Sequence, residues 1–457
     1  MTKTFKDHLS ATVKLGVPMV LMQITLMLIN VTDTLMLGWL GVKELVAGTL
    51  AFQLIFVIFI FGMGLATALM PLVSSAAGSN DTPAVRRSVR MGLWALVIMV
   101  SLLMIPMLFS EQILIALGQD PELSRVAQSY IDIAQWSLVP AFLLTGLRSF
   151  LASLEHTRVI LFVTLAMALL NATLNYALIF GNFGAPRLEI QGAAIATVLV
   201  NSIGFICLAL YVHYSRFCRP YEIFKRFWVP EWNAFIELIK IGLPISLMIF
   251  FEAGLFSAAA LMIGWIGATE LAAHGIAIQL ASLAYMVPLG LSQVASVRVA
   301  NAVGRKDRAG IALAANAVML IAIVIALALA LLFLLAPEYL IRLFLDENNV
   351  DASAVLSYAI PLLYVAALFQ IIDTLQVVSV GNLRGLKDTK VPMIIASISF
   401  WPIGLGAGYV MAFPIGLGSV GIWGGLVVGL TVAGVFLAWR FYKREQLGLV
   451  EFKNTEK

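Results

Sequence analysis

The stretch Lys14-Leu-Gly-Val-Pro18 recurs later in the chain as Lys240-Ile-Gly-Leu-Pro244, and each copy opens a long apolar run. The offset of 226 residues (240 minus 14) is kept by a second pair of segments, Leu37-Gly-Trp-Leu-Gly41 and Ile263-Gly-Trp-Ile-Gly267. Chance would not hold one register across separate runs, so the sequence contains a long internal repeat. We therefore expect two halves with one common architecture.

The apolar content of the chain indicates a membrane protein. Of its 457 residues, 61% are hydrophobic and 12% are charged, whereas soluble domains carry about 25% charged residues. The apolar residues come in runs of about 20 or more, the length at which a helix crosses ~30 Å of hydrocarbon. The alternating pattern of a membrane β-barrel is absent. The sequence thus predicts an all-α membrane protein.

Twelve apolar runs predict twelve transmembrane helices, six in each repeat. Because six is an even number, both halves cross the membrane in the same sense and form parallel repeats. We predict a first lobe over 1–215, a cytoplasmic linker over 216–236, a second lobe over 237–445 and a cytoplasmic tail over 446–457. The expected spans are 13–40, 45–75, 90–110, 126–147, 157–181, 190–214, 237–267, 271–302, 311–336, 354–381, 390–412 and 419–441.

Charges between the spans predict the orientation. The loops on one side are poor in Lys and Arg and in part acidic, as at Asp346, Glu347 and Asp351. By the positive-inside rule, the basic loops, both termini and the linker lie in the cytoplasm. The net charge of +4 reflects these loops, so we expect no nucleic-acid partner. The basic clusters follow spans two, four, six, eight and ten: Arg86, Arg87 and Arg90; Arg148 and Arg158; Arg216, Arg219, Lys225 and Arg226; Arg305, Lys306 and Arg308; Arg384, Lys387 and Lys390.

Three carboxylates lie inside the apolar spans: Asp33, Glu252 and Asp373. A charge near the bilayer centre costs at least ~3 kcal/mol, so such residues usually face a cavity or an ion path. Glu252 and Asp373 belong to the second lobe, where the pair could hold a proton or share a monovalent cation such as Na⁺. Gln370 and Gln376, three residues to either side of Asp373, extend a polar stripe on its helix. The alternative is that each acid is buried and merely hydrogen-bonded.

Asp33 has its own candidate partners in the first lobe. Asn171 and Asn175 lie one turn apart on span five and could face it, and with Thr34 they could form a site for a cation or a proton. The alternative is a hydrogen bond between helices, worth ~0.6 kcal/mol. Gln279 is a further polar candidate in span eight.

Other classes of function find little support. The sequence has no phosphate-binding loop, metalloprotease helix or nucleophile elbow. We therefore expect a transporter and not an enzyme, without a cofactor and without ATP. We interpret His274 as a core histidine and not a ligand. Cys207 lies in a span and Cys218 in a basic loop, so no disulfide is expected.

Several motifs of this chain resemble the NorM-type branch of the multidrug and toxic compound extrusion family. They are Phe250-Phe-Glu-Ala253, Ile372-Asp-Thr-Leu-Gln-Val-Val378, Leu383-Arg-Gly-Leu-Lys-Asp388 and Asn171-Ala-Thr-Leu-Asn-Tyr176. The resemblance implies two six-helix lobes around a central cavity, and export of cationic or amphiphilic organic compounds in exchange for H⁺ or Na⁺. It assigns the coupling ion to Glu252 and Asp373, and the first-lobe acid to Asp33.

The chain departs from this family at positions that bear on the coupling ion. Four residues before the span-ten acid, some relatives have a tyrosine that helps to coordinate the ion, and this chain has Phe369. After Leu147-Arg-Ser-Phe150, where some relatives carry an acid, it reads Leu151-Ala-Ser153. Loss of an oxygen ligand argues more against Na⁺ than against H⁺, which favours H⁺ slightly.

We therefore expect a monomeric antiporter of the cytoplasmic membrane that works by alternating access, with organic cations as substrates and the bilayer as its surroundings. The alternative is a flippase or exporter of lipid-linked or peptide precursors from the same superfamily. Such flippases carry several cations in the cavity, whereas the intramembrane charges here are acidic. A membrane enzyme or a receptor explains neither the repeats nor the buried acids.

Overall fold

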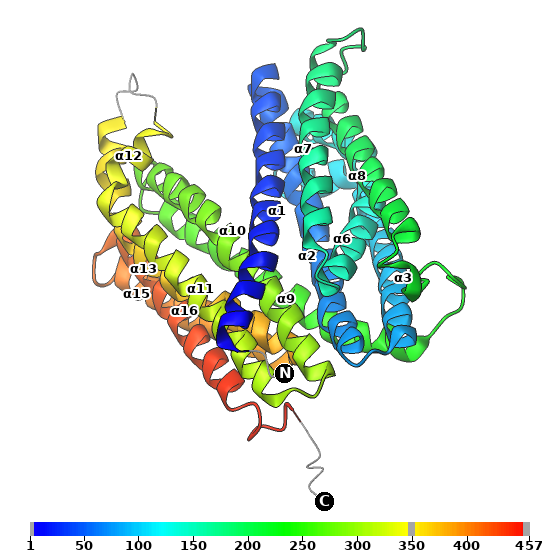
Figure 1. Ribbon diagram of the computed structural model, residues 1–457. Helices are drawn as coiled ribbons and strands as arrows, with labels where there is room; N and C mark the ends of the chain where they lie inside the picture. The colour runs from blue at the N-terminus through cyan, green and yellow to red at the C-terminus, as the bar shows by residue number, and fades with distance from the viewer. Residues whose placement is uncertain (1–3, 346–351, 451–457) are drawn as a thin grey trace, which may run out of the picture. The chain divides into compact units, whose positions relative to one another are not determined.

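The computed structural model describes residues 4–345 and 352–450, which form helices and connecting turns with no strand among them (Figure 1). Within these residues, twelve helices are long and apolar enough to cross a membrane, which confirms the predicted fold class. The spans are α1 (Phe5–Leu40), α2 (Val42–Gly78), α3 (Thr82–Met107), α5 with η1 and α6 (Pro121–Ser153), α7 (Thr157–Phe180), α8 (Glu189–Tyr214), α9 (Trp232–Gly264), α10 (Ala268–Gly304), α11 (Arg308–Leu335), α13 (Ala352–Gly385), α14 with η3 and α15 (Lys390–Ala412), and α16 (Gly418–Tyr442).

Two of the spans change helix type along their length. Between α5 (Pro121–Ala134) and α6 (Leu138–Ser153), the turn η1 (Gln135–Ser137) is a 3₁₀-helix. Between α14 (Lys390–Ile398) and α15 (Gly406–Ala412), the segment η3 (Ser399–Leu405) is a π-helix that contains Pro402. Proline cannot donate the helical hydrogen bond, and a π-turn is one way to accommodate that loss. The short helices α4 (Ser110–Ala116), α12 (Pro337–Arg342) and η2 (Arg219–Tyr221) lie between spans.

The same helix caps occur in both halves. Asp81 is the N-cap of α3, and its carboxylate accepts a hydrogen bond from the Ala84 amide at 2.9 Å. Asp307 is the N-cap of α11 and accepts from the Gly310 amide at 2.8 Å. The two caps are 226 residues apart (307 minus 81), the offset found in the sequence. The repeat therefore extends to the hydrogen bonds that start the third span of each half.

The chain forms two compact units, and each contains the first part of a helix that continues in the other. One unit runs from Leu21 to Ser246, and the second comprises the residues up to Val20 and those from Leu247 onward. The divisions fall inside α1 and α9, again 226 residues apart (246 minus 20). Both follow a helix-interior proline, Pro18 or Pro244, by two residues. The units thus divide within these helices, whereas the sequence analysis placed the lobe borders at the linker.

Polar contacts hold the first part of α1 in its unit. Arg298 on α10 donates from Nη1 to the His8 carbonyl at 2.5 Å and to the Thr12 hydroxyl, and its Nη2 lies 2.8 Å from His8 Nδ1. In the other unit, the first part of α9 is held by Ser246, whose hydroxyl donates to the Phe61 carbonyl of α2 at 2.8 Å. The two contacts are chemically different, so the repeat fixes the topology and not the side chains that secure it.

Arg148 and Arg384, expected just beyond the ends of their spans, lie inside the helices of those spans. Arg148 belongs to α6 and is 9% exposed, and Arg384 belongs to the last turn of α13. The prediction that they follow their spans is wrong, because the helices continue to Ser153 and Gly385. Further cations follow closely at 158, 387 and 390, so the sequence does not show where each helix ends. Asp346, Glu347 and Asp351 lie outside the described residues.

Candidate ion-binding site

Helix α13 buries a polar stripe centred on Asp373. The Asp373 side chain is 1% exposed, and neither of its carboxylate oxygens has a hydrogen-bond partner in the described chain. Gln370 and Gln376 are fully buried, and the oxygen and nitrogen of each amide are also without a partner. Burying a polar group without a partner costs free energy. The predicted stripe is therefore present, and its polar atoms are free to engage a proton, a cation or water.

Close packing of α10 on α13 seals part of this region. Ser292 on α10 donates to the Val377 carbonyl at 2.9 Å. A side chain at Gly381 would meet the Ser292 carbonyl oxygen at 2.3 Å, so only glycine permits this approach of the two backbones. One turn further along, Gly385 lies against Val299 in the same way. The two helices are thus held together just beyond the stripe, which fixes the position of Asp373.

The second acid, Glu252 on α9, lies near Asp373. Tyr285 on α10 donates its hydroxyl to Glu252 Oε1 at 3.3 Å. The charge of Glu252 acts on Asp373, and Tyr285 senses both acids. The structure therefore brings together the two acids that were paired from the sequence, and it adds a phenol that is hydrogen-bonded to Glu252.

Arg384 supplies a cation to this group. It lies eleven residues beyond Asp373, which is close to three helical turns and keeps both side chains on one face of α13. Its Nε is buried without a hydrogen-bond partner among the described residues, and its charge acts on Glu252 and Tyr285. With both acids ionised, Arg384 leaves the group with a net charge of about −1. One monovalent cation would neutralise it.

Asp33 forms a separate cluster in the unit that runs from Leu21 to Ser246. Asn171 Nδ2 donates to Asp33 Oδ1 at 3.0 Å, and Asn175 Nδ2 donates to the same oxygen at 2.5 Å. Tyr130 on α5 interacts electrostatically with Asp33. Both asparagines are almost fully buried. Asp33, unlike Asp373, already has amide donors, an arrangement that serves a structural role as well as a functional one.

The remaining candidates differ in their exposure. Thr34 is exposed, and its hydroxyl donates to the Asn30 carbonyl of its own helix at 3.0 Å. Gln279 is exposed on α10. His274 accepts a hydrogen bond from Trp423 Nε1 at 3.1 Å and is 3% exposed, which confirms its interpretation as a core histidine. Phe369 packs edge-on against Trp423, with ring centroids 5.6 Å apart.

Sequence reasoning missed Tyr130, Tyr285 and Arg384. The spacing of Asp373 and Arg384 on one helix face is a signal that could have identified the arginine. The two tyrosines reach acids on other helices, and no spacing within a single helix reveals such a partner.

The comparisons with known proteins agree with this fold. The MatE family model matches residues 18–177 and 244–410. A relative from Rhizobium meliloti (strain 1021), named probable multidrug resistance protein NorM, is 46% identical over 441 residues, covering 96% of this chain and 94% of its own. A protein of the same name from Agrobacterium fabrum is 44% identical, with 95% of this chain and 94% of its own covered.

Solved structures show the same architecture. A eukaryotic MATE transporter superposes with a TM-score of 0.84 at 21% identity, covering 97% of this chain and 99% of its own. A MOP superfamily transporter from Pyrococcus furiosus superposes with a TM-score of 0.88 at 19% identity, covering 99% and 100%. At these identities the likeness concerns the fold alone. Together with the family model and the bacterial relatives, it shows that this chain belongs to the MatE family, the multidrug and toxic compound extrusion family.

Proposed function

We propose that this protein is a secondary multidrug efflux antiporter of the cytoplasmic membrane, which exports cationic or amphiphilic organic compounds in exchange for H⁺ or Na⁺. It acts as a monomer with both termini in the cytoplasm. The family and the names of its bacterial relatives support efflux. The coupling ion binds at Asp373 and Glu252.

The observation that carries this proposal is the unpartnered carboxylate of Asp373. A structural acid in an apolar helix would have its oxygens hydrogen-bonded by the protein. Asp373 has none of these bonds within residues 4–345 and 352–450, and a second acid lies close to it. Two neighbouring acids, of which Asp373 has both oxygens without a hydrogen-bond partner among the described residues, attract a cation and release it once another positive charge replaces it.

Exchange follows from the charge of this group. A coupling cation and a cationic substrate both neutralise the same net negative charge, so binding of one weakens the binding of the other. Alternating access between the lobes then carries the ion inward and the substrate outward. One-for-one exchange of two monovalent cations moves no net charge, so the concentration gradient of the coupling ion drives export, with about 1.4 kcal/mol for each tenfold difference.

The side chains near Asp373 favour H⁺ as the coupling ion. Na⁺ prefers several hard oxygen ligands. Phe369, one turn before Asp373, is 3% exposed and packs against Trp423, so it contributes no oxygen. A proton needs a single carboxylate.

Export of ethidium from proteoliposomes tests the proposal. Wild type and Asp373→Asn are compared under an imposed pH gradient and, separately, an imposed Na⁺ gradient. We expect the pH gradient to drive wild-type export and Asp373→Asn to reduce it at least tenfold. Glu189→Gln, which removes an exposed acid paired with Arg187 at 3.4 Å, serves as the control and should retain export. Export that neither gradient drives contradicts coupled antiport, and normal export by Asp373→Asn contradicts the site.

A further inference from the structure

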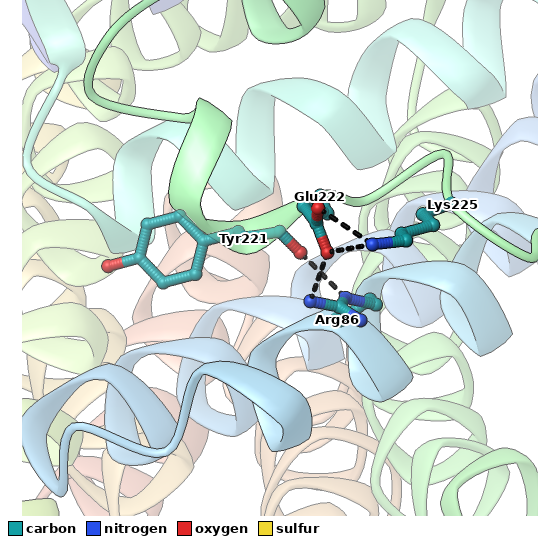
Figure 2. Close-up of polar contacts among 4 residues, drawn as sticks. All are labelled: Arg86, Tyr221, Glu222 and Lys225. Atoms are coloured by element: carbon teal, nitrogen blue, oxygen red, sulfur yellow. Dashed lines mark hydrogen bonds and ion pairs between the residues drawn. The ribbon is translucent and has the colours of Figure 1, made fainter.

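The connection between α8 and α9 is a folded segment held on α3. Arg86 Nε donates to the Tyr221 carbonyl at 2.9 Å, as Figure 2 shows. Arg90 Nη1 donates to the Arg226 carbonyl at 3.0 Å, and Trp94 Nε1 donates to the Phe227 carbonyl at 3.1 Å. Three side chains on one face of α3 therefore fix successive carbonyls of the connection.

Glu222 compensates part of the positive charge of this segment. Its carboxylate accepts from Arg86 Nη2 at 3.0 Å and from Lys225 Nζ at 3.0 Å (Figure 2). The hydrogen bond from Lys225, with the charges of Lys225 and Arg86, lowers the pKa of Glu222 below its ordinary value, so this carboxylate stays ionised at neutral pH. One negative charge thus serves two cations, while the nearby Arg219 is exposed and has no ion pair among the described residues.

The folded connection borders a partly open cavity of about 530 Å³ at the end of α8. Its floor is apolar, because Val212, Cys218 and Ile223 are buried. Arg219 and Lys225 line it with exposed positive charge. Tyr214, which is 74% exposed, and Phe224 add aromatic walls. His213 and Glu222 complete the lining, and the Glu222 carboxylate is paired with Arg86 and Lys225, which leaves Arg219 as the lining cation without an ion pair among the described residues.

We propose that this cavity binds the headgroup of an anionic phospholipid at the end of span α8. Arg219 and Lys225 hold the phosphate, and the apolar floor with Phe224 receives the glycerol and the upper acyl chain. Basic pockets beside transmembrane helices are suited to anionic lipid headgroups. Exposed aromatic side chains at a span end are typical of the level of the headgroups. A free phosphate offers the same charge but leaves the apolar floor unused, so the lipid fits the whole cavity.

Lipid retention by the purified full-length protein tests this inference. Wild type, Arg219→Gln and the double variant Arg219→Gln with Lys225→Gln are exposed to dioleoylphosphatidylglycerol or to zwitterionic dioleoylphosphatidylcholine. Bound lipid is then counted by native mass spectrometry. We expect about fivefold weaker phosphatidylglycerol binding for each cation removed. The matched control is Arg305→Gln with Lys306→Gln, which removes two exposed cations from the connection between α10 and α11 and should change binding less than twofold.

Each outcome decides between specific and general binding. If the double variant and the control lose phosphatidylglycerol binding equally, the lipid is held by general surface attraction and the proposed site is wrong. Equal retention of the two lipids by the wild type also contradicts the site. If millimolar inorganic phosphate displaces the lipid completely, the cavity is a site for free phosphate and the lipid assignment is wrong. Lys225 also contacts Glu222, so its removal could loosen the segment. Arg219→Gln alone, whose side chain has no ion pair to lose, keeps the test valid.

Discussion

A single residue, Arg384, sets the net charge around the pair of acids Glu252 and Asp373. Its Nε is buried without a hydrogen-bond partner in the described part of the chain, and its charge acts on Glu252. We predict that Arg384→Gln lowers the half-saturating concentration of the coupling ion about tenfold, because a nearby cation no longer opposes ion binding. Release of the tighter-bound ion slows, so maximal export falls. Arg384→Lys keeps the charge and should restore most of the export. Equal behaviour of the two variants in proteoliposome assays would show that the charge does not matter.

Phe369 gives a second prediction about a single residue. Its ring packs against Trp423 and Phe256, with centroids 5.6 and 6.1 Å away. Phe369→Tyr adds a hydroxyl one turn before Asp373, and we expect it to make export respond to an imposed Na⁺ gradient. If the hydroxyl finds no ion or carboxylate, its burial costs about 1–3 kcal/mol. A lower unfolding temperature with no Na⁺ response would contradict the idea that this position selects the ion.

Individual residues were predictable where one helix contains the whole pattern. The unusual cost of an acid in an apolar span identified Asp373 and Glu252 without any partner in view. The spacing of Asn171 and Asn175, one helical turn apart, indicated that both could face Asp33. In the structure both side-chain amides donate to Asp33. Tyr285 was not predictable, because its contact with Glu252 depends on how α9 and α10 pack.

At the scale of elements, glycines bring the π-helical span against α16. A side chain at Gly425 would meet the backbone nitrogen of Gly408 at 2.2 Å, whereas one at Gly424 meets only the Met411 sulfur at 3.1 Å. We predict that Gly425→Ala destabilises the protein by about 1–3 kcal/mol, as overpacking does. The control Gly424→Ala should change stability by less than about 0.5 kcal/mol. Thermal unfolding in detergent measures both, and similar unfolding temperatures would contradict this packing.

The folded connection between α8 and α9 predicts a pH-dependent reactivity. Burial raises the pKa of the Cys218 thiol to about 11. The thiolate is the reactive form, so iodoacetamide labelling at pH 8 should be about a hundredfold slower than for a free cysteine, whose pKa is about 8.5. The labelling rate should rise about tenfold per pH unit up to about pH 11, and the thiol's contribution to stability is lost over the same interval. The labelling rate is measured by mass spectrometry. A rate that levels off near pH 9 would mean that the Cys218 thiol is not buried by the segment.

At the scale of the whole molecule, the apolar runs predicted the twelve spans and the repeat predicted two halves, but neither indicated where the units divide. The offset of 226 aligns Pro18 with Pro244, and the described units divide two residues after each. The sequence placed the border at the charged linker, since composition changes there. Composition follows contact with water and lipid, whereas a unit is defined by which helices pack together. The first parts of α1 and α9 are apolar in either unit, so no local signal marks their exchange.

This exchange predicts that neither half of the chain folds on its own. A fragment of residues 1–231 lacks the first part of α9, and a fragment of residues 232–457 lacks the segment of α1 that Arg298 holds. Each would expose the apolar surface that the missing segment covers, for example around Gly64, which lies against Ser246. We expect each fragment alone to aggregate or be degraded. Co-expressed fragments should associate and restore ethidium export, because the cut leaves the contacts of Arg86, Arg90 and Trp94 in one piece. A monodisperse, protease-resistant 1–231 fragment would show that the unit is complete without α9.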